Sequence, residues 1–228
     1  MIDHAHDLVS VRDATERLLT AVGKLDNAAV TEPSRLPGWS RGHVLAHLAR
    51  NADALVNVLE ARPMYASGEA RDADIERDAP RPLEAQLADV RESAARFQAT
   101  GAAPADWTRT VELRNGVTDS ASRVPFRRWV EVELHHVDLG IGYELEDLPA
   151  EFTERETDFL AARFAGHPDV PPTRLTDGTR VWHTGREAGT PEVTVSGPPA
   201  DLLGWLAGRR EGSALTAEGG PLPALPPL

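Results

Sequence analysis

The chain has 228 residues, of which 41% are hydrophobic and 26% are charged, a composition typical of a globular protein rather than a disordered one. Its net charge is −12 and it has no basic run, which argues against binding to nucleic acid or to an acidic membrane surface. It contains no cysteine, so disulfides and a protein thiol nucleophile are excluded. We therefore expect a small-molecule partner.

Hydrophobic periodicity predicts two helices in the first 63 residues. The first has one apolar stripe with a spacing of three or four residues, at Leu8, Val11, Thr15, Leu18, Val22 and Leu25. The segment TEPSRLPGWS predicts a turn, with Ser40 as the N-cap of the next helix. That helix ends near Pro63 and has the apolar face Val44, Leu45, Leu48, Ala52, Leu55, Val56 and Leu59.

Two more helices are predicted before residue 148, separated by a hairpin or extended loop around Asn115-Gly116. The third helix is expected to end at Gly101 and has the apolar positions Leu83, Leu87, Val90, Ala94 and Phe97. The fourth has Pro125 in its first turn and the core-facing positions Phe126, Trp129, Val130, Leu134, Val137 and Ile141. Four amphipathic helices predict a bundle.

The pattern changes at about residue 149. A helix at 151–166, β-like runs at 179–185 and 192–197, and a helix at 199–209 predict a small α/β domain. The fold class is therefore α+β, with a helical bundle at 1–148 and a smaller domain at 149–228 whose last ten residues, GGPLPALPPL, form a loose tail. The N-terminus does not resemble a signal peptide and no apolar run reaches the ~18 residues of a membrane helix, so we expect a soluble cytoplasmic protein.

The predicted fourth helix carries four side chains that can bind a metal or move a proton, in the sequence WVEVELHHVDLG. Glu131 and His135 are four residues apart on one helical face, so they can share an ion. Asp138 follows one turn later, whereas His136 is rotated by roughly 100° and faces elsewhere. Glu133 also faces away from Glu131 and is expected to be solvated. Alone, such a Glu–His pair is more often a surface helix stabiliser.

The predicted second helix adds His43 and His47, one turn apart in the apolar sequence HVLAH, where an unpaired imidazole costs desolvation energy. Two histidines and a carboxylate from two helices of a bundle can hold a divalent ion and leave a coordination position for a ligand. The alternative is a pair of capped or half-exposed histidines. The spacing does not choose between His43 and His47.

The segments RLPGWSRGHVLAHLARNADAL, PMYASGEAR, WVEVELHHVDLG and VSGPPADLLGWLAGR resemble, in this order, the mycothiol-dependent maleylpyruvate isomerase family. The resemblance implies a DinB-like four-helix bundle followed by a domain similar to sterol carrier proteins. It implies that zinc, or another divalent ion, is bound by His47, Glu131 and His135. It also implies that Arg71 and Arg209 meet the anionic substrate or the thiol, although a lone arginine is more often a solvated surface group.

The activity that the resemblance implies is isomerisation of maleylpyruvate to fumarylpyruvate with mycothiol as cofactor. A free thiol is only a few per cent ionised at neutral pH, and zinc coordination ionises it. The thiolate would add to the cis double bond, and rotation followed by elimination would give the trans isomer. Arg71 and Arg209 would hold the diacid and offset the enolate charge.

Two other functions remain open at this point. In a mycothiol S-transferase the same thiolate attacks an electrophile and the adduct is the product, so each turnover consumes one thiol. In a non-catalytic module the three residues form a structural zinc site or a buried polar cluster, although structural zinc sites usually have four protein ligands, often cysteines. The sequence makes no prediction of the oligomeric state.

Overall fold

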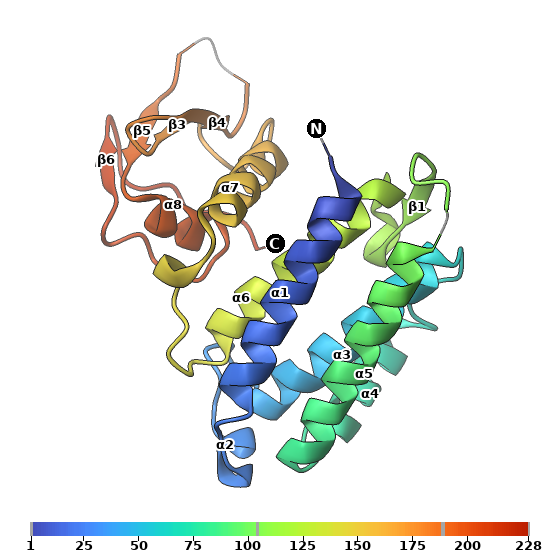
Figure 1. Cartoon of the computed structure of the whole chain (residues 1–228). Coiled ribbons are helices and arrows are strands. Elements are labelled where there is room, and N and C mark those ends of the chain that lie inside the picture. Colours follow the sequence, from blue (N-terminus) through green and yellow to red (C-terminus); the bar gives the residue numbers. More distant parts are fainter. Residues whose placement is uncertain (1, 104, 188–189, 228) are drawn as a thin grey trace. The chain divides into compact units, whose positions relative to one another are not determined.

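The computed structural model describes residues 2–103, 105–187 and 190–227 (Figure 1). The chain divides into two compact units, residues 1–143 and residues 144–228. The division follows Tyr143, a few residues before the predicted boundary at residue 148. The fold is α+β, as predicted, with a helical first unit and a mixed second unit.

Four long helices form the first unit: α1 (His4–Val22), α3 (Arg41–Leu59), α5 (Leu83–Ala102) and α6 (Val124–Asp138). Helix α1 packs against α6, α6 against α3, α3 against α5, and α5 against α1, which closes the bundle (Figure 1). Most positions of the predicted apolar stripes face its interior, where the fully buried side chains include Val11, Leu18, Leu45, Leu48, Leu55 and Phe97. Val130 is only half-buried, whereas Val132, which was not in the predicted stripe, is buried. The predicted bundle is therefore confirmed.

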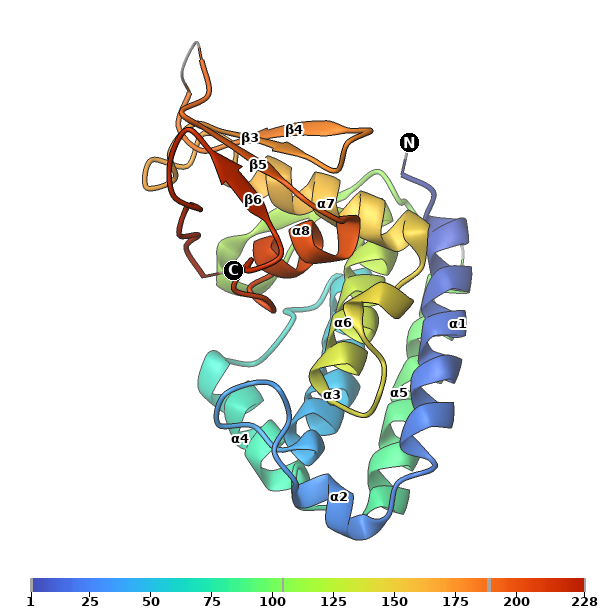
Figure 2. The ribbon, with the colours of Figure 1, turned by 90° about the vertical axis from the view of Figure 1, so that its left-hand side faces the viewer.

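Two shorter helices and a hairpin complete this unit: α2 (Asn27–Thr31), α4 (Gly68–Asp78), β1 (Thr110–Glu112) and β2 (Thr118–Ser120). Helix α4 packs beside α3 (Figure 2) and was not predicted, because Ile75 is its one buried apolar residue and its surface is mainly charged. The hairpin was predicted. Its turn is the 3-10 segment η1 (Arg114–Gly116), in which Asn115 and Gly116 have positive φ angles of 60° and 72°.

The beginning of α3 is fixed by a capping box. Ser40 is its N-cap, as predicted, and its side chain accepts a hydrogen bond from the backbone of His43, whose Nδ1 in turn accepts one from the backbone N–H of Ser40. Gly42 lies directly against the C-cap of α4, since a Cβ atom there would come within 2.1 Å of the Ala79 carbonyl oxygen. These contacts set where α3 starts and thereby where its later residues point.

The second unit contains η3 (Leu145–Asp147), α7 (Ala150–Phe164), α8 (Pro199–Leu206) and four strands in the order β4 (Val181–Thr184), β3 (Thr173–Thr176), β5 (Val193–Ser196) and β6 (Thr216–Glu218). Strands β3 and β5 are parallel and the other pairs are antiparallel. Both helices lie on one side of the sheet (Figure 2), and Leu175, Val193 and Val195 are buried. The prediction of an α/β unit is confirmed, although β3 and β6 were missed.

The proline-rich tail differs from its prediction as a loose segment outside the fold. Pro223 is buried, and a Cβ atom on Gly212 would meet the Leu222 side chain. The tail therefore packs on the second unit. None of the described helices combines the length and the apolar character needed to cross a membrane.

Candidate metal centre

Two adjacent helices of the bundle bring the three predicted ligands together. His47 lies in the middle of α3, and Glu131 and His135 lie one turn apart on α6. The Oε2 atom of Glu131 is 2.9 Å from Nε2 of His47 and 3.2 Å from Nε2 of His135. The two imidazole rings meet edge to face, with their centres 4.6 Å apart. Both Nε2 atoms therefore converge on one carboxylate oxygen.

The protonation of this cluster reflects its burial. Burial lowers the pKa of His47 to about 4, against a hydrogen bond and a charge from Glu131 that raise it. Burial raises the pKa of Glu131, but hydrogen bonds from His135 and His47 outweigh this and hold it well below its usual value. His47 is therefore neutral at physiological pH and Glu131 is ionised, the states in which these side chains bind a metal.

Asp138 orients His135 from the side opposite the cluster. Its Oδ2 atom lies 2.9 Å from Nδ1 of His135, and the carboxylate is fully buried. Burial lowers the pKa of His135, but hydrogen bonds to Asp138 and Glu131 outweigh it and raise the pKa above its usual value. The Asp138 contact leaves Nε2 of His135 facing Glu131, an arrangement common behind metal-binding histidines.

Arg71 on α4 is the predicted substrate-binding residue that lies beside the cluster. Its Nη2 atom is 3.1 Å from Nδ1 of His47, and its Nη1 donates to Asp72. The guanidinium carbon also lies 6.0 Å from the centre of the Tyr65 ring. Trp39, in the loop before α3, covers another side, with its ring centre 5.6 Å from that of His47.

The other predicted candidates lie elsewhere. His43 takes part in the cap of α3 and its Nε2 is 3.4 Å from Glu76, so it is absent from the cluster. His136 faces away, as its rotation predicted, and stacks on Tyr143 with ring centres 4.0 Å apart. Arg209 follows α8 in the second unit, where its Nη1 donates to the Ala207 carbonyl.

Glu133 corrects one prediction. It was expected to be solvated, but it is 1% exposed and accepts hydrogen bonds from Trp129, Tyr143 and Arg17. The last two donors come from other parts of the chain, which helical geometry alone does not reveal. Three donors, one of which is the cation of Arg17, compensate the cost of burying this carboxylate.

Arg128 was not predicted as a functional residue, although it joins the two helices that carry the predicted ligands. It lies on α6, three residues before Glu131, and is 1% exposed. Its Nη1 donates to the Leu48 carbonyl at 2.9 Å and to Asn51 Oδ1 at 2.8 Å, both on α3. Because Leu48 follows His47 directly, Arg128 ties the helix of one predicted ligand to the helix of the other two.

The donor set fits a divalent ion. One ligand atom from each of His47, Glu131 and His135 lies within 4.8 Å of the others, and these three form the one such group found among the described residues. Two imidazoles and a carboxylate match the three-ligand sets of catalytic zinc sites, in which the fourth position takes water or substrate. The rigid helices and the Asp138 contact hold the donors in place.

Family models match both units of the chain. The model described as the mycothiol maleylpyruvate isomerase N-terminal domain matches residues 11–140, and the model of the corresponding C-terminal domain matches residues 147–227. The chain belongs to the mycothiol maleylpyruvate isomerase family. The resemblance inferred from the sequence motifs is thereby confirmed.

Two solved structures resemble the chain over nearly its whole length. One is the crystal structure of the mycothiol-dependent maleylpyruvate isomerase, with 28% identity, a TM-score of 0.89, and coverage of 99% of this chain and 97% of that chain. The other is a variant of that isomerase in which a histidine is replaced by alanine, with 27% identity and the same TM-score and coverage. No match was found among proteins of curated function.

Proposed function

We propose that the protein is a mycothiol-dependent isomerase that converts maleylpyruvate into fumarylpyruvate at a zinc centre formed by His47, Glu131 and His135. The observation that carries the proposal is the convergence of these three donors in a member of this isomerase family. Three protein ligands leave a position for an external group, and a chain without cysteine needs an external thiol.

When bound, the ion would supply ionisation of the thiol at neutral pH. Raising the ionised fraction from a few per cent to nearly one is worth about 2 kcal/mol, at roughly 1.4 kcal/mol per tenfold. This is a small part of the amount by which an enzyme lowers the activation free energy of a reaction. Orientation of the substrate and stabilisation of its developing charge by the protein's own residues supply the remainder.

Arg71 is placed to perform both tasks. Its guanidinium is in contact with His47, so a carboxylate held by Arg71 would lie beside the metal centre. The same cation would offset negative charge as it develops on the substrate's carbonyl oxygen. We assign Arg209 a similar role from the second unit. Replacement of either arginine by methionine should lower turnover of the diacid and leave zinc content unchanged.

The deciding experiment measures maleylpyruvate turnover by the zinc-loaded protein with and without mycothiol, with a His47→Ala variant as control. The proposal expects thiol-dependent conversion that leaves the thiol concentration constant and disappears in the variant. Consumption of one thiol per turnover would instead identify an S-transferase. Bound zinc with no response to thiol would identify a non-catalytic module.

A further inference from the structure

A cavity of about 600 Å³ lies in the first unit between the end of α3, the segment 61–68 and the β1–β2 hairpin. This volume is within the range of small-molecule sites. Apolar side chains, among them Val58, Met64 and Leu113, form part of its wall, and Tyr65 and Arg114 also line it. We call this space the hairpin cavity.

Tyr65 connects the hairpin cavity to the metal centre. It lines the cavity, and its ring is 6.0 Å from the guanidinium carbon of Arg71, which contacts His47. Burial raises the pKa of Tyr65, and the charges that act on it are those of Arg71, Glu131 and Arg114. Tyr65 therefore neighbours Arg71, which lies beside the metal centre, and shares the wall of the hairpin cavity with Arg114.

The cavity wall is basic. It carries Arg62, Arg109 and Arg114, against one carboxylate, that of Glu112. Arg62 forms an ion pair with Glu60, and Arg109 donates to the carbonyls at the end of α3. These two guanidinium groups already have structural partners.

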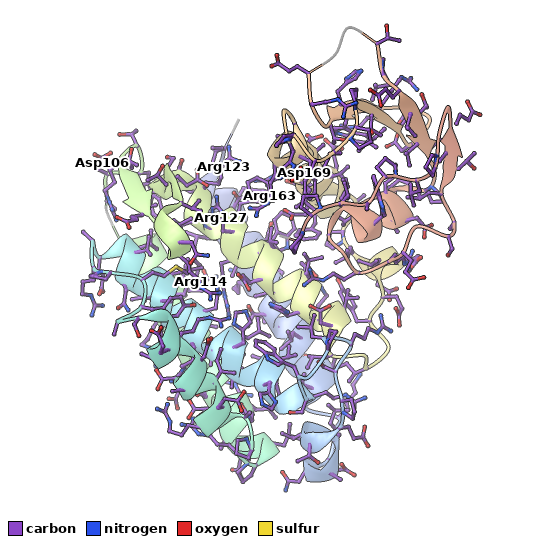
Figure 3. The ribbon with its side chains drawn as sticks, turned by 180° about the vertical axis from the view of Figure 1, so that it is seen from behind. Asp106, Arg114, Arg123, Arg127, Arg163 and Asp169 are labelled. Atoms are coloured by element: carbon purple, nitrogen blue, oxygen red, sulfur yellow. The ribbon has the colours of Figure 1, made fainter. Side chains whose placement is uncertain are left out.

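Arg114 differs from the other arginines of this region. Figure 3 labels it with Arg123 and Arg127, and both of those form ion pairs with Asp119. Within residues 2–103, 105–187 and 190–227, no carboxylate forms an ion pair with Arg114. Its charge is thus available to an anion that enters the hairpin cavity.

We propose that the hairpin cavity is a carboxylate-binding subsite in which Arg114 holds the distal carboxylate of a dicarboxylate substrate, while Arg71 holds the carboxylate nearer the metal centre. This inference rests on the proposed function and assigns the residue that holds the second carboxylate of its diacid substrate. A dianion needs a cation at each end to be oriented. Arg71 lies 6.0 Å from the centre of the Tyr65 ring, and Arg114 lines the hairpin cavity together with Tyr65.

A binding experiment without turnover tests the subsite. The zinc-loaded full chain, without thiol, is titrated calorimetrically with pimelate, a saturated seven-carbon dicarboxylate, and with its monoamide. Arg114→Met should weaken pimelate binding by roughly 10- to 100-fold, the usual effect of losing a charge-assisted hydrogen bond, and leave monoamide binding unchanged. Arg62→Met is the matched control, since it removes the same charge from the same wall and should have little effect.

Equal weakening of both ligands by Arg114→Met, or equal effects of the two variants, would overturn the subsite. Turnover separates this inference from the proposed function. If the wild type isomerises maleylpyruvate and Arg114→Met leaves its KM unchanged, the subsite is wrong and the isomerase stands. If pimelate binding depends on Arg114 while no thiol-dependent turnover occurs, the subsite stands and the isomerase is wrong.

Discussion

At the residue scale, the chemistry of the centre depends on one carboxylate between two imidazoles. Glu131 contacts the Nε2 atoms of His47 and His135, and its pKa is held well below its usual value. A buried carboxylate requires positive charge nearby, and hydrogen bonds to Asp138 and Glu131 raise the pKa of His135, which favours its protonated form. A divalent ion would take the place of that proton, so metal binding should release protons.

Asp138→Asn should lower zinc affinity by roughly 10- to 100-fold, the range typical of a lost partner behind a metal-binding histidine. The amide keeps the size of the carboxylate but loses the charge that supports Nδ1–H of His135. Competition with a chromophoric chelator measures the affinity. Glu76→Gln, which alters the contact of His43 instead, is the control and should leave affinity unchanged. Unchanged affinity in Asp138→Asn would contradict the role assigned to Asp138.

Tyr143 predicts a pH dependence of stability. Its pKa is raised, first by burial and then by the charge of Glu133, to which its hydroxyl donates at 2.8 Å. A raised pKa means that Tyr143 loses its proton at a lower pH in the unfolded chain than in the folded one. Its contribution to the free energy of unfolding is therefore fully present below about pH 10 and is lost as pH rises above it. Above that pH, wild type should lose up to about 1.4 kcal/mol per pH unit more than Tyr143→Phe. Parallel curves of Tm against pH for the two proteins would exclude this linkage.

At the scale of elements, the centre depends on how α3 and α6 are held together. His47 belongs to α3 and the other two predicted ligands belong to α6, so sliding of one helix would separate the donors. Arg128 bonds to Leu48 and Asn51 across this contact. Burial lowers the pKa of Arg128 to about 10, which leaves it charged at neutral pH. Burying this cation has a desolvation cost. In return, its hydrogen bonds to Leu48 and Asn51 hold α6 and α3 in register.

Arg128→Met should weaken zinc binding by roughly tenfold, because the donors would no longer be held in register. The metal-free protein should remain folded, since methionine fills much of the space and removes a buried charge. Chelator competition gives the affinity and circular dichroism gives the Tm. Arg127→Met, one residue earlier and paired with Asp119, is the matched control. Equal affinity in both variants would show that Arg128 has no positioning role.

At the scale of the whole molecule, the predicted ligands and their supports all belong to residues 1–143. This unit has its own buried core, in which side chains such as Leu48 and Phe97 are fully enclosed. Arg209 belongs to the other unit. Residues 1–143 should therefore bind the metal by themselves, whereas full catalytic activity should also require Arg209 of the second unit.

A fragment of residues 1–143 should fold and bind one equivalent of zinc, because no predicted ligand is removed. It should not isomerise maleylpyruvate at the rate of the full chain, because Arg209 is missing. Metal analysis and circular dichroism establish that the fragment is folded and loaded before turnover is measured. Full activity of the fragment would refute the role proposed for Arg209, and a fragment without zinc would refute the separation itself.

Local spacing was sufficient to predict the four long helices, the hairpin turn, and the pairing of Glu131 with His135, because residues four apart on a helix share a face. The sequence motifs were also sufficient to identify the family. Helix α4 was missed because its sequence has almost no apolar stripe. The role of the three residues as metal ligands remains a prediction.

Helical spacing did not choose between His43 and His47, and the family resemblance favoured His47. The tertiary structure places His47 beside Glu131, since that depends on which turn of α3 faces α6. It also decided that Glu133 is buried, because its partner Arg17 lies 116 residues away in the chain. Helical periodicity describes one element at a time, whereas burial and ion pairing are set by the elements packed around it. The four long helices were therefore readable from local pattern, whereas the contacts of polar side chains with distant parts of the chain were not.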